Sequence, residues 1–188
     1  MSELLHLLPQ VDRAVMSLAH EVRWEPLTAL LVLASAAFVK GPLIVCCGAM
    51  ADVRARRKLP LAAAAAGSAA LAGAAASGLV KITVERLRPP LSDPEVTTLV
   101  ALPDGYSFPS GHATTAFAAA AAVGVLHPRL RWPLLALAAV VGFSRVYLGV
   151  HWGLDVLAGA TLGTAIGVGC ALLARRLVRA RAERAPAH

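Results

Sequence analysis

Residues 60–80 read PLAAAAAGSAALAGAAASGLV, and Lys81 follows directly. A helix needs about 20 mostly apolar residues to cross the hydrocarbon core of a bilayer. This stretch has that length and contains no charged side chain. It predicts a membrane helix, which we extend over residues 60–88, because Pro89 and Pro90 then stop it.

Four further apolar stretches, on both sides of this one, predict helices of the same kind: 27–50, 111–126, 132–149 and 154–174. The composition agrees, since 57% of the residues are hydrophobic and 15% are charged, against about 45–50% and about 25% in soluble domains. We therefore expect an all-α integral membrane bundle of about five transmembrane helices, forming one domain over residues 1–188.

The segment 1–24 has a different pattern, because one helical face is apolar and another is polar. The apolar face carries Leu4, Leu8, Val11, Val15, Ala19 and Val22. The polar face carries His6, Gln10, Arg13, Ser17 and His20. Two interpretations fit this pattern equally: a helix that lies in the membrane interface, or a helix that packs against the bundle.

The orientation follows from lysines and arginines in the short connections, which favour the cytoplasmic side. Eleven of these residues fall in three segments on one side, namely 54–58, 129–131 and the basic tail 175–188. Six fall on the other side: Arg13, Arg23, Lys81, Arg86, Arg88 and Arg145. We expect a cytoplasmic C-terminus and an extracytoplasmic N-terminus. Lys40 lies within the stretch 27–50, and we interpret it as facing a polar cavity or snorkelling to the interface.

The composition argues against nucleic-acid binding, because only 5% of the residues are aromatic and base stacking needs such platforms. Cys46, Cys47 and Cys170 lie in apolar stretches without metal-ligand spacing. The chain has no H-E-x-x-H motif. We expect neither a metal nor another cofactor.

The first polar cluster follows the opening stretch. Lys81 and Arg88 are seven residues apart, which is two helical turns, so both should project from one helix face and converge on an anion such as phosphate. The alternative is a pair of cationic anchors at the membrane interface.

The second cluster is Pro109-Ser110-Gly111-His112, directly before the stretch 111–126. Ser110 is a plausible N-cap, and Gly111 would let an oxyanion approach the backbone closely. The free N–H groups at the start of a helix bind phosphate. His112 would then stand in the first turn beside that anion, or else be an interfacial histidine satisfied by water.

The third cluster is SRVYLGVHWGLD, residues 144–155. His151 and Asp155 are four apart and would share a helix face, so the carboxylate could hold the Nδ1 proton and leave Nε2 as a nucleophile. Arg145 offers a fork of donors that matches phosphate. A purely structural polar pair would not explain why all three clusters fall on the same predicted side of the membrane. Together they provide three cations, which can neutralise a phosphoryl group without a metal.

The three clusters resemble the signature motifs of the type 2 phosphatidic acid phosphatase family, KxxxxxxRP, PSGH and SRxxxxxHxxxD. Lys81, Arg88 and Pro89 match the first motif, residues 109–112 match the second, and Ser144, Arg145, His151 and Asp155 match the third. Members similar to this chain usually have six spans, so residues 3–22 are interpreted as a reduced first span.

The resemblance implies a role for each residue. His151 would attack phosphorus, Asp155 would orient it and His112 would protonate the leaving group. Lys81, Arg88, Ser110, Gly111 and Arg145 would hold the phosphate. Lys40, Tyr106 and Phe108 are possible substrate contacts, the last two in the loop 90–108, which would help choose the headgroup.

The expected function is hydrolysis of a lipid phosphate or diphosphate at the extracytoplasmic face of a bacterial plasma membrane, with the bilayer as partner. A polyprenyl (di)phosphate is the first candidate substrate, and phosphatidic acid and phosphatidylglycerol phosphate are alternatives. Vanadium haloperoxidases resemble the family in their anion pocket, but they are soluble. A transporter or binder of anionic lipid headgroups is an alternative of another class. The sequence leaves the oligomeric state open.

Overall fold

The computed structural model describes residues 2–36, 41–57 and 59–184, and the regular elements in these ranges are all helices. The N-terminal part contains α1 (Ser2–Glu21), α2 (Glu25–Ala34), α3 (Pro42–Arg54), α4 (Leu61–Val84) and the short α5 (Pro89–Ser92). The C-terminal part contains α6 (Gly111–Leu126), the 3₁₀ turn η1 (Pro128–Leu130), α7 (Arg131–Tyr147) and α8 (Gly153–Arg184). The expected all-α fold is confirmed.

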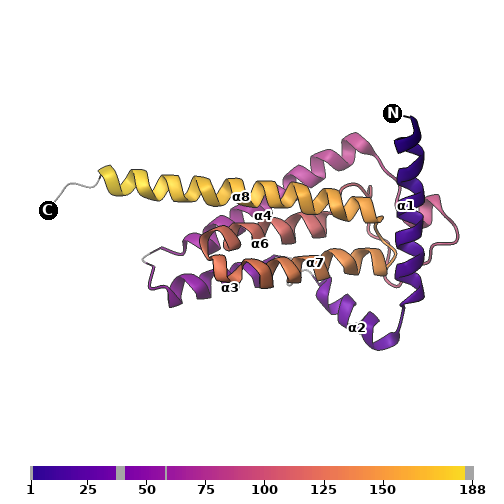
Figure 1. Ribbon diagram of the computed structural model, residues 1–188, viewed down its shortest axis with the longest axis horizontal. Helices are drawn as coiled ribbons and strands as arrows, with labels where there is room; N and C mark the ends of the chain where they lie inside the picture. Colours follow the sequence, from indigo (N-terminus) through magenta and orange to yellow (C-terminus); the bar gives the residue numbers. More distant parts are fainter. Residues whose placement is uncertain (1, 37–40, 58, 185–188) are drawn as a thin grey trace.

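The four helices α4, α6, α7 and α8 run side by side along the long axis of the molecule, and α1 crosses one end of them (Figure 1). The segment between α4 and α6 and the turn between α7 and α8 lie at this end, which we call the α1 end. At the other end, α8 projects beyond the bundle (Figure 1).

The centre of the bundle is α6, which is apolar and buried on nearly all its faces and packs against α3, α4, α7 and α8. The approach of α8 depends on three glycines spaced four apart, Gly159, Gly163 and Gly167. A Cβ at Gly159 would lie 2.6 Å from the Ser110 carbonyl oxygen, and one at Gly163 or Gly167 would overlap the next carbonyls along α6. Small residues at this spacing let helix backbones pack closely in membranes.

Three stretches in the described part of the chain are long and apolar enough to cross a membrane: Leu61–Ser92, Pro128–Tyr147 and Gly153–Arg184. Two shorter apolar helices, Glu25–Ala34 and Gly111–Leu126, fall on the other expected spans. The total number of spans stays a prediction.

The expectation of one helix over 27–50 is wrong, because α2 ends at Ala34 and α3 begins at Pro42. Proline has no N–H and a fixed φ, so Pro42 suits the first position of a new helix. Lys40, which we expected to face a polar cavity or to snorkel, lies outside the described residues.

Two other helix ends differ from expectation. The helix expected over 60–88 ends at Val84, because Glu85 adopts a left-handed conformation with φ of 52° and the chain is then extended up to Pro89. The basic segment 175–188, expected as a tail, is helical as far as Arg184 and continues α8. Its arginines suit the last turns of a helix, where the dipole favours positive charge.

The N-terminal helix α1 has three distinct faces. Asp12, Met16 and Ala19 are buried against the bundle. A second stripe is apolar but exposed: Leu8, Val11, Val15, Leu18 and Val22. The polar residues Gln10, Arg13, Ser17 and Glu21 form the third. The helix thus packs on the bundle and also leaves an apolar face uncovered, so features of both interpretations are present; its place in the membrane stays a prediction.

A buried carboxylate, Asp52, joins three helices at the end opposite α1. Its Oδ2 accepts a 2.6 Å hydrogen bond from the Ala62 N–H at the start of α4. Its Oδ1 lies 2.9 Å from Nε2 of His127, directly after α6, and 3.5 Å from Nε of Arg57. Asp52 therefore caps α4 from a distance and ties α3 to α6.

Candidate phosphoryl-transfer site

The turn between α7 and α8 fixes His151 at the α1 end. The Arg145 carbonyl accepts hydrogen bonds from the N–H groups of Val150 and His151 at 3.1 and 3.2 Å. Gly149 turns the chain with φ of 76°, and a side chain there would overlap the Thr97 carbonyl. His151 is 3% exposed. The imidazole is thus held in a tight, buried turn rather than on a helix.

The two ring nitrogens of His151 face different partners. Nδ1 lies 3.5 Å from Oδ2 of Asp155 and 3.3 Å from Oγ of Ser107. Nε2 lies 3.3 Å from a guanidinium nitrogen of Arg88. Because arginine has only donors, Nε2 must accept the hydrogen bond from Arg88. We therefore assign the proton to Nδ1, which faces the Asp155 carboxylate. This arrangement leaves the lone pair on Nε2.

The charge state of His151 agrees with this assignment. The pKa of His151 falls from 6.5 to about 4, mainly because the ring is buried; the hydrogen bond to Asp155 partly opposes this shift, and the charge of Arg88 adds to it. The imidazole is therefore neutral at pH 7. A buried neutral histidine oriented by a carboxylate can act as a nucleophile or base.

Asp155 lies in the first turn of α8, so the expectation that it shares a helix face with His151 is wrong, because His151 precedes the helix. The two side chains meet because the turn folds back. Oδ2 accepts the Trp152 N–H at 2.9 Å, as in a capping box, and the Ser107 hydroxyl donates to the same oxygen. Arg86 donates to Oδ1 at 2.6 Å. The carboxylate is fully buried and fixed by these donors.

Lys81 and Arg88 do not share a helix face, since α4 ends between them. Both instead bind the backbone of the loop before α6. Arg88 donates to the carbonyls of Gly105 and Asp104 at 3.0 and 3.3 Å, and to that of Val150 at 2.9 Å. Lys81 donates to the carbonyls of Tyr106 and, at 3.4 Å, Ser107. Contacts with this loop, rather than a shared helix face, therefore bring Lys81 and Arg88 together.

Arg145 provides the third cation and is 5% exposed. Its Nε is buried and has no hydrogen-bond partner in residues 2–36, 41–57 and 59–184. Buried donors are normally paired, so this N–H is suited to an anionic ligand.

The second motif stands at the start of α6, where Ser110 is the N-cap, as expected, and accepts the Ala113 N–H at 3.5 Å. The Ser110 N–H binds the Asp155 carbonyl at 2.9 Å, which joins the starts of α6 and α8. Gly111 and His112 are the first two residues of α6, and both are partly exposed. The helix start therefore borders the His151–Asp155 pair.

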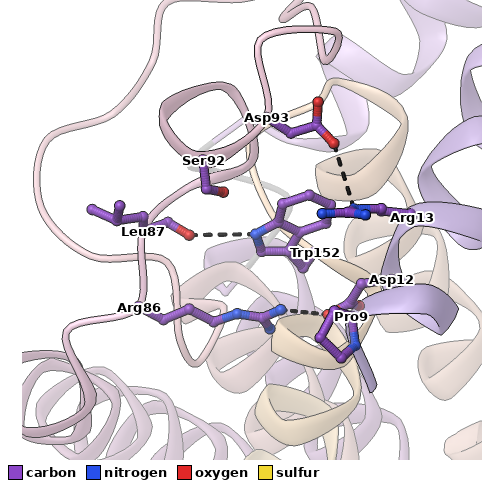
Figure 2. A pocket seen from close by; sticks show the side chains of 8 residues that line it. All are labelled: Pro9, Asp12, Arg13, Arg86, Leu87, Ser92, Asp93 and Trp152. Carbon is purple, nitrogen blue, oxygen red and sulfur yellow. Dashed lines mark hydrogen bonds and ion pairs between the residues drawn. The ribbon is translucent and has the colours of Figure 1, made fainter. Parts of the chain in front are cut away.

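Four residues near the pair were not expected from the sequence as part of the site: Asp12, Arg86, Ser107 and Trp152. Figure 2 shows Arg86 reaching Asp12 of α1, and Nε1 of Trp152 donating to the Leu87 carbonyl at 3.3 Å. The Arg86 guanidinium also lies over the Trp152 ring, 5.7 Å from its centroid. Of these four, only Asp12 could have been found from the sequence. It lies four and seven residues before Met16 and Ala19, so helical periodicity puts it on the same face as these two apolar residues.

The possible substrate contacts Tyr106 and Phe108 lie in the loop before α6, and both are partly exposed. A hydrogen bond with Glu85 raises the pKa of Tyr106, so this hydroxyl stays protonated. Within the described residues, no three histidine, cysteine, aspartate or glutamate side chains form a group that could hold a metal ion.

Comparison with known proteins gives a family match: a model described as the PAP2 superfamily matches residues 61–179. An undecaprenyl-diphosphatase of Sulfolobus acidocaldarius is 48% identical over 63 residues, 33% of this chain and 31% of that protein. A decaprenylphosphoryl-5-phosphoribose phosphatase of Mycobacterium tuberculosis is 38% identical over 124 residues, 64% of this chain and 63% of that protein. The matches thus span less than two thirds of either relative.

Two solved structures are similar over most of their length. The PAP2-type phosphatidylglycerolphosphate phosphatase of Bacillus subtilis has a TM-score of 0.68 and 26% identity, over 92% of this chain and 87% of that one. The LpxE protein of Aquifex aeolicus has a TM-score of 0.67, over 87% of this chain and 93% of that one. Its identity of 22% shows the fold alone.

Proposed function

The chain belongs to the PAP2 superfamily, and from that premise we propose that it hydrolyses a lipid phosphate or diphosphate through a phosphohistidine intermediate. The observation that carries the proposal is the buried imidazole of His151, with Nδ1 3.5 Å from Asp155 and Nε2 3.3 Å from Arg88. Its lone pair points toward a cation, which is where a phosphoryl group would be bound.

In the proposed first step, Nε2 of His151 attacks phosphorus. An N–P bond forms while the bond from phosphorus to the leaving oxygen breaks, and His112 donates a proton to that oxygen. Asp155 stabilises the positive imidazole that develops. In the second step, water attacks phosphorus and gives a proton to His112, the N–P bond breaks, and inorganic phosphate leaves.

The phosphoryl oxygens would be held by Lys81, Arg88 and Arg145, with the Ser110 side chain and the Gly111 N–H in support. The unpaired Nε of Arg145 supports this role. Donors that are already in place where negative charge develops stabilise the transition state without a metal. We therefore propose hydrolysis that needs no metal and no other cofactor.

A polyprenyl phosphate or diphosphate is the substrate class we favour, because two of the similar proteins are named for undecaprenyl and decaprenyl substrates. An apolar cavity of about 380 Å³ supports a lipid tail, since Val15, Phe117, Phe143 and Leu157 line it and Gly153 borders it beside the site. Phosphatidic acid and phosphatidylglycerol phosphate are the alternatives. Tyr106 and Phe108, both partly exposed in the loop before α6, are the proposed headgroup contacts.

We propose that the site faces the extracytoplasmic side of a bacterial plasma membrane and that the C-terminus is cytoplasmic. The support is the distribution of basic residues in the sequence: eleven lie in the segments 54–58, 129–131 and 175–188, which alternate onto one side, and six lie in segments on the other side, together with the candidate site. The bilayer is then the partner of the apolar helix surfaces.

The test is phosphate release by the purified protein in detergent with a chelator present. The substrates are a polyprenyl diphosphate, a polyprenyl monophosphate, phosphatidic acid and phosphatidylglycerol phosphate. Release that persists without metal and disappears in His151→Ala supports the proposal. Near-normal turnover in His151→Ala would refute it. Binding of these lipids without any release would favour a binder or transporter of anionic headgroups.

A further inference from the structure

Two buried carboxylates from distant parts of the chain share one guanidinium, that of Arg86. Nη1 of Arg86 donates to Oδ1 of Asp155 at 2.6 Å, and Nη2 donates to Oδ2 of Asp12. The Asp155 and Asp12 side chains are 0% and 2% exposed, while that of Arg86 is 28% exposed. Figure 2 shows Arg86 directed toward Asp12, beneath the Trp152 ring. Asp12, Arg86 and Asp155 therefore form a chain that leads from α1 to His151.

The two oxygens of Asp155 are used differently along this chain. Oδ1 binds Arg86, whereas Oδ2 binds Ser107 and the Trp152 N–H and faces Nδ1 of His151. Since each oxygen has its own donors, Arg86 limits rotation of the carboxylate. Without Arg86, the group could turn either oxygen toward His151 or tilt away from it.

Asp12 holds Arg86 and also touches α8 itself. Its Oδ1 accepts the Leu154 N–H at 2.9 Å, in the residue directly before Asp155. A carboxylate in the first turn of a helix accepts from a backbone N–H that has no partner within the helix, and its negative charge is stabilised by the helix dipole. Asp12 lies outside residues 61–179, which match the family model. Through the buried carboxylate of Asp12, α1 thus contacts the residues that surround His151.

We propose that Arg86, held by Asp12 of α1, is a positioning residue that aims Oδ2 of Asp155 at Nδ1 of His151. The inference rests on the proposed function. Arg86 would not bind phosphate, because each of its terminal nitrogens already donates to a carboxylate and the group of three carries a net negative charge. Its loss should therefore lower kcat rather than weaken substrate binding.

The test compares Arg86→Gln, Arg86→Lys and Asp12→Asn with a matched control, Arg13→Gln. Arg13 lines the same cavity of about 360 Å³ and pairs with Asp93 at 3.7 Å, but it is 70% exposed. We expect Arg86→Gln to lose about 10- to 100-fold in kcat, by analogy with the cost of removing a residue that orients a metal ligand. KM and the inhibition constant of inorganic phosphate should stay within about threefold, and Arg13→Gln should match the wild type.

Three further results would separate positioning from a general packing defect. Arg86→Lys should regain part of the lost kcat, because an ammonium group can still bind one carboxylate. Guanidinium ions added to Arg86→Ala should restore activity in a saturable way, since the site borders an open cavity. Asp12→Asn/Arg86→Gln should be no slower than Arg86→Gln, because in the proposal Asp12 acts on Asp155 through Arg86 and the amide oxygen of the substituted side chain can still accept the Leu154 N–H.

Unchanged kcat in Arg86→Gln would overturn the proposal, and so would a large rise in KM with kcat preserved. If the Arg86 variants do not fold, Asp12→Asn provides the test, because asparagine keeps the shape of the side chain. Unchanged kcat in Asp12→Asn would show that α1 does not help to position Asp155. Failure of the proposed function is a separate outcome, since the wild type would then release no phosphate and behave like His151→Ala.

Discussion

At His151, the buried environment and the charge of Arg88 act on the imidazole in the opposite direction to Asp155. Burial and Arg88 favour the neutral ring, while Asp155 favours the charged one, and the pKa falls to about 4. A neutral ring is what nucleophilic attack requires. In the proposed reaction, the Asp155 carboxylate would stabilise the positive charge that develops on the ring.

The lowered pKa of His151 predicts a specific pH dependence of stability. In the unfolded chain the residue titrates near 6.5, and in the folded protein near 4, so between these values the unfolded state binds the extra proton. The stability present above pH 6.5 is therefore lost as the pH falls toward 4. Denaturation of the wild type and of His151→Gln between pH 7 and 4 measures the effect. A constant difference between the two proteins over this range would contradict the pKa.

Asp155→Asn should separate orientation from charge at the same pair. The amide fits the same space, but its NH₂ group can face Nδ1 and favour the wrong tautomer of His151. In the serine protease triad the equivalent change lowers kcat on the order of 10⁴-fold, and we expect a loss of about that size here. Steady-state kinetics on a soluble short-chain lipid phosphate would measure it. A variant within tenfold of the wild type would show that Asp155 is only a helix cap.

Arg145→Gln tests the unpaired buried donor. Removing the charge should raise KM and the inhibition constant of inorganic phosphate by about tenfold or more, since a hydrogen bond to a charged group contributes about 1.5–3 kcal/mol. Arg145→Lys should recover little, because lysine lacks the planar fork. Inhibition by phosphate, measured in parallel for both variants, gives the answer. Normal inhibition in Arg145→Gln would exclude Arg145 from the phosphate site.

At the scale of elements, the contact between α6 and α8 positions Ser110 beside Asp155. We predict that Gly163→Ala destabilises the protein by several kcal/mol, because the new Cβ would overlap the Thr114 carbonyl in a packed interface. Gly169→Ala is the matched control on the same helix, since nothing lies within 4 Å of its Cβ. There the change should stabilise by about 0.5–1 kcal/mol through helix propensity. Thermal unfolding in detergent compares them, and equal melting temperatures would contradict the close approach.

The motifs predicted the site better than the helix geometry that was used to explain them. Lys81 and Arg88 do meet the same loop, and His151 and Asp155 do pair, yet neither pair shares a helix face. The reason is where the helices end and begin: Glu85 turns out of α4 between Lys81 and Arg88, and α8 begins at Gly153, after His151. Periodicity describes one helix at a time, so it does not predict contacts between residues on either side of a helix end.

Residues that act through a partner were the hardest to predict. Asp12 is 143 positions before Asp155, and only the packing of α1 across the bundle brings it to Arg86. Ser107 reaches the pair because the loop before α6 folds over it. In contrast, the apolar stretches gave the all-α bundle directly, since length and hydrophobicity decide whether a helix can lie in a membrane.

At the scale of the whole molecule, the two ends of the bundle have different polar chemistry. The α1 end holds Asp12, Arg86 and the candidate site, and Arg23 ties α1 to this end by bonds of 2.8 Å to Thr97. The opposite end holds the Asp52–His127 pair, which joins α3 to the end of α6, and the basic end of α8. Because the ends differ in basic residues, the charge rule predicts one orientation for the molecule.

This orientation can be tested with single cysteines in a background without Cys46, Cys47 and Cys170. Ser92→Cys places an exposed thiol at the α1 end, and Arg129→Cys places one at the opposite end. An impermeant maleimide should label Ser92→Cys in intact cells and Arg129→Cys only after the cells are opened, because the charge rule predicts that the opposite end faces the cytoplasm. Phosphate release by each variant confirms that the protein is folded. The reverse labelling pattern would place the site in the cytoplasm, where it would act on lipids of the inner leaflet instead.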